Sequence, residues 1–358
     1  MSWKLAWMDW SCLTAFESQA AADFHFDPFT THWETPSWMP TVDSPSDNAD
    51  TSRIHDELYT SDAWLEEQVK IDALPDVPDD LPRAIAGLMF WSDATHLTQL
   101  GTAKMWPLYL YFGNQSKLLQ GKPSARASHH VAYIPSLPDS FQDFVRTFNK
   151  GKSGSEDLLK HCKRELFHAV WSLMMDSEFL HAYRHGIVVR CGVGITRRLF
   201  LAYLHIPQIT PRIATIRNLG NCPCPLCLVH RDDIHLLGTA QDQQTRSEHA
   251  RTDDEDHRRR VGLARDIIYK QGYAPGNEHS EQFLKEDSSV ATENTFSAKL
   301  VQTFEFNYFG WLVYVRREQL SVRGNTFLSA PFPKLSFSSL YYANVSINAD
   351  KCTQNTLK

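Results

Sequence analysis

One uninterrupted apolar run constrains the fold of this chain more than any other feature. Residues 84–91 read Ala-Ile-Ala-Gly-Leu-Met-Phe-Trp and are followed by Ser92 and Asp93. A run of strand length without polar alternation predicts a strand that is buried on both faces, as in the centre of an α/β sheet. Two more apolar stretches, residues 106–112 and 130–135, come at close spacing. The sequence therefore predicts three consecutive strands.

Helical periodicity follows these strands. Apolar residues recur every three or four positions from Leu159 to Leu173, which predicts an amphipathic helix. Ser153 and Glu156 fit a capping box at its start. A second helix is expected over 177–185, because a glycine that can end it comes next.

The next segments predict a hairpin and further short elements. Residues 187–191 and 198–205 are apolar stretches joined by a glycine-rich turn, and 213–216 is another strand candidate. Helices are expected over 56–69 and 254–269. The chain is thus expected to be an α/β protein with a mixed sheet and flanking helices.

Acidic residues are concentrated at the start of the chain. Residues 1–80 hold 17 Asp or Glu against three Lys or Arg, a net of −14, so the remainder carries 33 bases against 25 acids, a net of +8. Residues 1–55 mix aromatic residues with Pro, Ser, Asp and Thr without a sustained period, which predicts a poorly ordered arm. Residues 314–358 also lack a period, so disordered termini are expected at both ends.

Composition also limits where the protein works. No apolar run reaches the roughly 18 to 20 residues of a membrane-spanning helix, and the first residues do not form a signal-peptide core. The seven cysteines are an odd number, three of them clustered, which does not resemble a secreted disulfide framework. We expect a protein of the nucleus or cytoplasm that is not secreted and has no membrane partner.

The clustered cysteines are the sharpest local motif. Cys222, Cys224 and Cys227 lie in a proline-rich turn with His235 close behind. Two thiolates separated by two residues can reach one zinc ion at about 2.3 Å, and the other two side chains would complete a tetrahedron. Such a closed site is structural. The alternative is a set of reduced cysteines in a tight loop.

Two other features point to nucleic-acid chemistry. Asp93 follows a buried strand, where a carboxylate can hold a magnesium ion, although an Asp at that place is more often a turn or helix cap. The stretch from Phe179 to Arg231 contains seven arginines and no Asp or Glu. Arg197 and Arg198 within it are candidates for binding DNA phosphate, and the alternative is a solvated basic surface.

Several of these segments together resemble the Plavaka-type transposases of basidiomycete fungi, relatives of the CACTA elements. The resemblance covers roughly residues 55–313. It rests on these stretches: Leu88-Met89-Phe90-Trp91-Ser92-Asp93-Ala94-Thr95-His96-Leu97, residues 106–117, Gly121-Lys122-Pro123-Ser124, residues 130–135, His161-Cys162-Lys163-Arg164-Glu165-Leu166, residues 222–228 and Phe304-Glu305-Phe306-Asn307-Tyr308-Phe309.

The resemblance implies a fold and a domain plan. It predicts an RNase H-like core over 56–236, with the zinc knuckle at 220–236, and a partial helical insertion region over 237–313. An acidic arm at 1–55 and an unpatterned tail at 314–358 flank these parts. DNA is the partner that the family implies; the resemblance leaves the oligomeric state open.

The family's activity would need an Asp-Asp-Glu set holding two magnesium ions for DNA strand cleavage and transfer. Asp93 matches the first carboxylate. The second belongs to a Tyr-Ser-Ala-Asp-Tyr-Pro-like segment, but residues 200–210 contain no acid. The third belongs to a helix after Phe309, where only Glu318 occurs and nothing around it matches. The chain is therefore expected to be a truncated, degenerate copy that does not cut DNA.

Two alternatives remain open at this point. One is a domesticated zinc-containing protein that binds DNA or another partner. The other is an active metal-dependent DNA nuclease or strand transferase in which an unrecognised acid, such as Asp176 or Asp232, completes the site.

Overall fold

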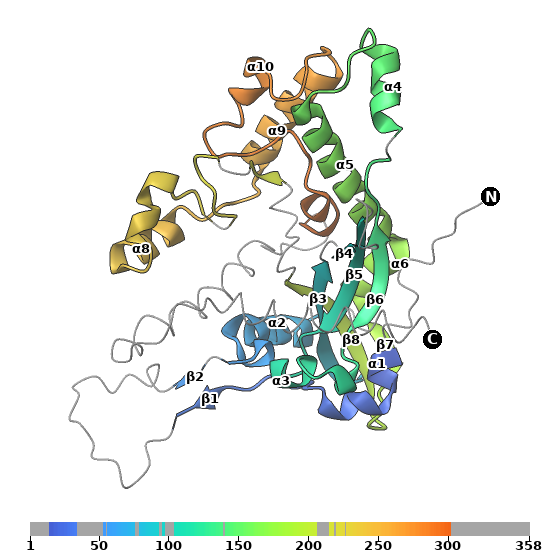
Figure 1. The fold of residues 1–358 in the computed structure, drawn as a ribbon. Helices are drawn as coiled ribbons and strands as arrows, with labels where there is room; N and C mark the ends of the chain where they lie inside the picture. The colour runs from blue at the N-terminus through green and yellow to red at the C-terminus, as the bar shows by residue number, and fades with distance from the viewer. Residues whose placement is uncertain are drawn as a thin grey trace.

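The computed structural model consists of a mixed sheet, the helices that cover it, and a helical region after the cysteine cluster (Figure 1). It describes residues 14–33, 53–54, 56–75, 79–92, 95–96, 104–138, 140–205, 215–217, 220–225 and 227–301. The α-helices are α1 (Thr14–Glu17), α2 (Asp62–Asp72), α3 (Lys117–Gln120), α4 (Phe141–Phe148), α5 (Glu156–Met174), α6 (Ser177–His185), α8 (Ala240–Glu248), α9 (Glu255–Tyr269) and α10 (Glu278–Glu281). None of the helices in these ranges is long and apolar enough to cross a bilayer.

Six strands form the mixed sheet, and the three expected from the apolar stretches are confirmed. They are β3 (Arg83–Ser92), β4 (Thr95–His96), β5 (Lys104–Phe112), β6 (His129–Ile134), β7 (Ile187–Arg190) and β8 (Thr196–His205). The order is β4-β5-β3-β8-β7, with β6 also paired to β5. β3 is antiparallel to β5 and parallel to β8. The pairs Ser92–Leu108 and Thr95–Met105 share one register, so β4 continues the pairing of β3.

The central strand β3 is buried on both faces because helices pack on each side of the sheet. On one face, Leu88 and Phe90 lie in the main core with α5, whose Trp171 meets the Phe90 ring edge-on at 5.1 Å between centroids. On the other face, Trp64 of α2 packs with Ile85. Full burial of such a side chain is worth roughly 1.5–3 kcal/mol. Alternate residues of the apolar run thus serve two cores, which explains why the run has no polar position.

Residues 14–33 correct the prediction of a poorly ordered arm over 1–55. Phe16 and Phe24 are buried, and the Phe16 ring lies edge-on to Phe112 of β5 at 4.7 Å between centroids. The Phe16 carbonyl accepts a hydrogen bond of 2.8 Å from the Gly192 amide, and a Cβ at Gly192 would lie 1.9 Å from the Ser18 carbonyl oxygen. The prediction was wrong for this segment because isolated aromatic residues dock onto a distant sheet without a local period.

Helix ends follow capping chemistry, with one shift from the expectation. The side chain that accepts a hydrogen bond at the start of α5 belongs to Ser155, through the Leu158 amide at 3.2 Å, and not to Ser153. α6 ends as predicted, at Gly186, whose φ of +68° favours glycine. The first predicted helix, expected from residue 56, begins at Asp62.

The helical region after the cysteine cluster is built around α9. Val261, Ala264 and Ile268 of α9 form a small core with Leu284 and Ala291. This confirms the helix expected over 254–269. The region is tied to the sheet domain, because Arg265 pairs with Glu165 of α5 and Lys299 donates to two carbonyls at the end of α5.

Two other expectations meet the limits of the described residues. The strand candidate 213–216 lies partly outside them, and Ile216 forms an isolated bridge with Ser289. The tail 314–358 lies wholly outside them.

Candidate functional site

The strand tip expected to carry metal chemistry lies at one edge of the sheet. β3 and β8 run parallel, with Arg83 opposite Arg198 and Met89 opposite His205. The carboxyl ends of parallel strands share an edge, which is where open α/β sheets bind ligands. Asp93 directly follows β3 and lies outside the described residues. The fold therefore brings the ends of β3 and β8 to one edge of the sheet, and the predicted role of the Asp93 carboxylate stays a prediction.

Neither alternative acid is free in the structure. Asp176 caps α6, because its carboxylate accepts a 2.8 Å hydrogen bond from the Phe179 amide. Asp232 is exposed and contacts His230 at 3.2 Å. Both acids thus have local roles. The segment that follows β8, residues 206–214, and the segment after Phe309 lie outside the described residues.

The cysteine turn brings two of its three thiols together. The Cys224 and Cys227 side chains are hydrogen-bonded, and this contact, followed by burial, raises the pKa of Cys227. Arg246 donates to the Cys227 sulfur at 3.3 Å. Cys227 also forms an isolated bridge with Ala250. The Cys227 thiol is therefore held in the protonated form, and a zinc ion would have to displace its proton.

The other two predicted zinc ligands point elsewhere. The Cys222 thiol lies 3.6 Å from the Glu286 carbonyl oxygen. His235 is exposed, and its Nδ1 lies 2.7 Å from the Asp232 carbonyl oxygen. Across the described parts of the chain, no three His, Cys, Asp or Glu side chains are grouped closely enough to hold a metal ion. The donor set in place is a pair of thiols, so zinc binding by all four residues stays a prediction.

Arg251 frames the cysteine turn and was missed by sequence reasoning. Its guanidinium donates to the Cys222 carbonyl at 2.7 Å and to the Cys224 carbonyl at 2.9 Å. Burial lowers the pKa of Arg251. No local pattern could have found this residue, because it lies well beyond the motif and reaches it only through the fold.

The two predicted DNA-binding arginines both have intramolecular partners. Arg198 is buried, pairs with Asp79 and donates to the His185 carbonyl at 2.9 Å. The Arg197 guanidinium lies 4.2 Å from the centre of the Phe26 ring. At least two arginines of the acid-free segment therefore make contacts within the molecule. DNA binding by Arg197 and Arg198 stays a prediction.

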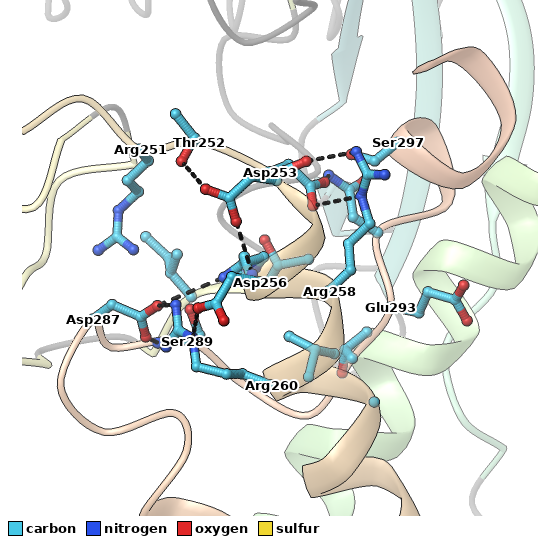
Figure 2. Close-up of a pocket in the computed structure, with 18 of the residues that line it drawn as sticks. Arg251, Thr252, Asp253, Asp256, Arg258, Arg260, Asp287, Ser289, Glu293 and Ser297 are labelled. Atoms are coloured by element: carbon cyan, nitrogen blue, oxygen red, sulfur yellow. Dashed lines mark hydrogen bonds and ion pairs between the residues drawn. The ribbon is translucent and has the colours of Figure 1, made fainter. Parts of the chain in front are cut away.

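A polar pocket of about 470 Å³ lies beside the cysteine turn, between the start of α9 and the segment after α10 (Figure 2). Arg260 bonds Asp287 at 2.9 Å, and Arg258 bonds Asp253 at 3.2 Å. Burial alone would raise the pKa of Asp287, but hydrogen bonds from His257 and Ser289 and the charge of Arg260 outweigh it and hold the pKa well below its usual range. The wall thus carries paired charges of both signs, with more carboxylates than arginines. Sequence reasoning missed this pocket because its residues meet only in the fold.

Comparison with known protein families gives a match over most of the chain. A family model described as Plavaka transposase matches residues 34–286, more than two thirds of the chain. The match includes the sheet, the cysteine turn and α9, and it leaves out the packed segment 14–33. No curated protein matches the chain.

Proposed function

The chain belongs to the Plavaka transposase family, and from this membership we propose that it is a catalytically defective transposase that keeps the sheet and the cysteine turn. We include in the proposal that the sheet is a degenerate RNase H-like core. The antiparallel run β3-β5-β6 with a parallel β8 beside β3 supports that part. An origin in a truncated, CACTA-related basidiomycete element and a nuclear location belong to the same proposal.

One observation carries the loss of activity: no Asp or Glu occurs between Phe179 and Arg231. The resemblance puts the second metal-binding carboxylate in residues 200–210, where β8 ends at the same sheet edge as β3. This stretch supplies none. Magnesium prefers carboxylate oxygens and releases its water reluctantly, so Asp93 alone cannot hold two ions.

The cysteine turn supports a structural metal as a second part of the proposal. Cys224 and Cys227 would be the first two ligands, since their thiols already touch. Cys222 and His235 would have to turn toward them to complete the set. Zinc in such a closed site would hold the turn and leave no open position for water.

Plasmid nicking tests the loss of activity. We expect the full chain with Mg²⁺ or Mn²⁺ to nick supercoiled plasmid no faster than its Asp93→Ala variant. An Asp233→Ala variant, which removes an exposed acid, controls for a contaminating nuclease. Robust nicking that Asp93→Ala abolishes and Asp233→Ala leaves intact would contradict the proposal.

A second candidate function is DNA binding without catalysis by a domesticated protein. The net charge of +8 beyond residue 80 favours it. Filter binding should then weaken steeply with salt, because released counterions drive the association. Arg197→Ala tests the predicted contact. Arg198→Ala would also break the ion pair with Asp79, so its effect on DNA binding would be mixed with an effect on stability. Arg190 is exposed, and Arg190→Ala is therefore the better second variant for comparison with Arg197→Ala.

A further inference from the structure

The short helix α4 presents two aromatic rings to solvent. Phe144 and Phe148 are 61% and 76% exposed, and their ring centroids lie 5.0 Å apart. No residue of α4 is buried. The two rings are adjacent, and contiguous exposed apolar surface is a feature of binding sites.

The rings sit on a fixed corner between α4 and α5. The Gly154 amide donates to the Gln142 side chain at 2.9 Å, and Arg146 donates to the Ser153 hydroxyl at 3.2 Å. A Cβ at Gly154 would lie 3.3 Å from Val145, so the two arms of the corner approach closely. The two phenylalanines are therefore displayed by an anchored element.

The turn beside the rings is basic. Lys150 and Lys152 are exposed, and neither pairs with an acid within the described residues. Asp143, the acid on α4, is already paired with Arg146 at 2.7 Å. Lys150 has a φ of +50° and Gly151 a φ of +77°, so the chain reverses at this point.

We propose that Phe144, Phe148, Lys150 and Lys152 form a binding surface for single-stranded DNA. Bases stack on exposed aromatic rings whatever their sequence, and lysines meet the phosphates. Charge complementarity favours this occupant over a second copy of the chain, which would bring lysines against lysines. The inference rests on the proposed function, because it assumes that the protein handles DNA.

Fluorescence anisotropy of the full chain with a labelled thymidine oligonucleotide tests the aromatic part. Each of Phe144→Ala and Phe148→Ala should weaken binding about tenfold, in line with the usual loss of a stacked base. Leu118→Ala is the matched control, because Leu118 is 74% exposed on α3. Circular dichroism should be unchanged for all three variants, since none of these side chains is buried.

Lys150→Asn tests the charge without disturbing the turn. Asparagine tolerates a positive φ, so the corner is kept while the charge is lost. We expect weaker binding and a shallower salt dependence. Lys122→Asn, at another exposed lysine, should change neither.

The outcomes separate this inference from the proposed function. Binding by the wild type that all the Phe and Lys variants retain would overturn the surface and leave DNA binding intact. No binding by the wild type would overturn both. Self-association that Phe144→Ala and Phe148→Ala abolish, with DNA binding unchanged, would assign the surface to a second copy and overturn the inference.

Discussion

Asp287 shows how a single residue joins two parts of the helical region. It accepts hydrogen bonds from Arg260 of α9 at 2.9 Å and from the Ser289 amide at 3.1 Å. Its pKa is held well below the usual range against the effect of burial, so the carboxylate form is the one that the fold stabilises. A group with a depressed pKa contributes stability above its unfolded value of about 4 and loses it as the pH falls toward the folded value.

Asp287→Asn should therefore destabilise the protein at neutral pH by about 2 kcal/mol, because charged hydrogen bonds are lost. The difference from the wild type should shrink below about pH 4. Urea unfolding at pH 7 and pH 3 measures both. Asp256→Asn is the control, since Asp256 is an exposed partner of the same Arg260 and should cost little. Equal losses at both positions would refute the role of Asp287.

Arg251→Lys should loosen the cysteine turn. A lysine cannot reproduce two guanidinium bonds to the Cys222 and Cys224 carbonyls, so a loss of about 1–3 kcal/mol is expected in urea unfolding. If the turn holds zinc, metal analysis of the purified variant should also show a lower zinc content than the wild type. A variant as stable as the wild type would show that these two bonds do not support the turn.

At the scale of elements, the start of α5 offers two candidate capping residues, Ser153 and Ser155. The spacing pointed to Ser153, whereas the Ser155 side chain makes the bond in the structure. Ser155→Ala should cost about 1 kcal/mol, and Ser153→Ala should cost less, because its hydroxyl accepts an exposed hydrogen bond from Arg146 and does not cap the helix. Thermal unfolding of the two variants decides the matter, and the opposite ranking would restore the original reading.

The strands were predictable and the sites were not, for physical reasons. A strand such as β3 carries its signal locally, because burial on both faces leaves an apolar run. The cysteine turn carried a local spacing, but the positions of Cys222 and His235 depend on partners such as Glu286 that no spacing encodes. The polar pocket beside the cysteine turn, which Asp287 lines, depends wholly on contacts between segments that are distant in sequence.

For the whole molecule, the packed segment 14–33 ties together parts that are far apart in sequence. The Asn114 side chain donates to the His25 carbonyl at 3.0 Å, and the His25 ring stacks on Tyr59 at 4.0 Å. Phe16→Ala should cost about 3–5 kcal/mol by opening a cavity against Phe112. Phe29→Ala, at a half-exposed ring, should cost far less. Denaturant unfolding compares the two, and a small effect at Phe16 would show that the segment adds little.

This segment also bears on how the gene is best cut for expression. The family match begins at residue 34, so a fragment that starts there lacks Phe16, Phe24 and Phe26. The face of β5 around Phe112 would then be exposed to solvent as an apolar surface to which other molecules can bind. Aggregation of such a fragment during expression would result from the choice of its first residue, and would not show that the full chain is unable to fold.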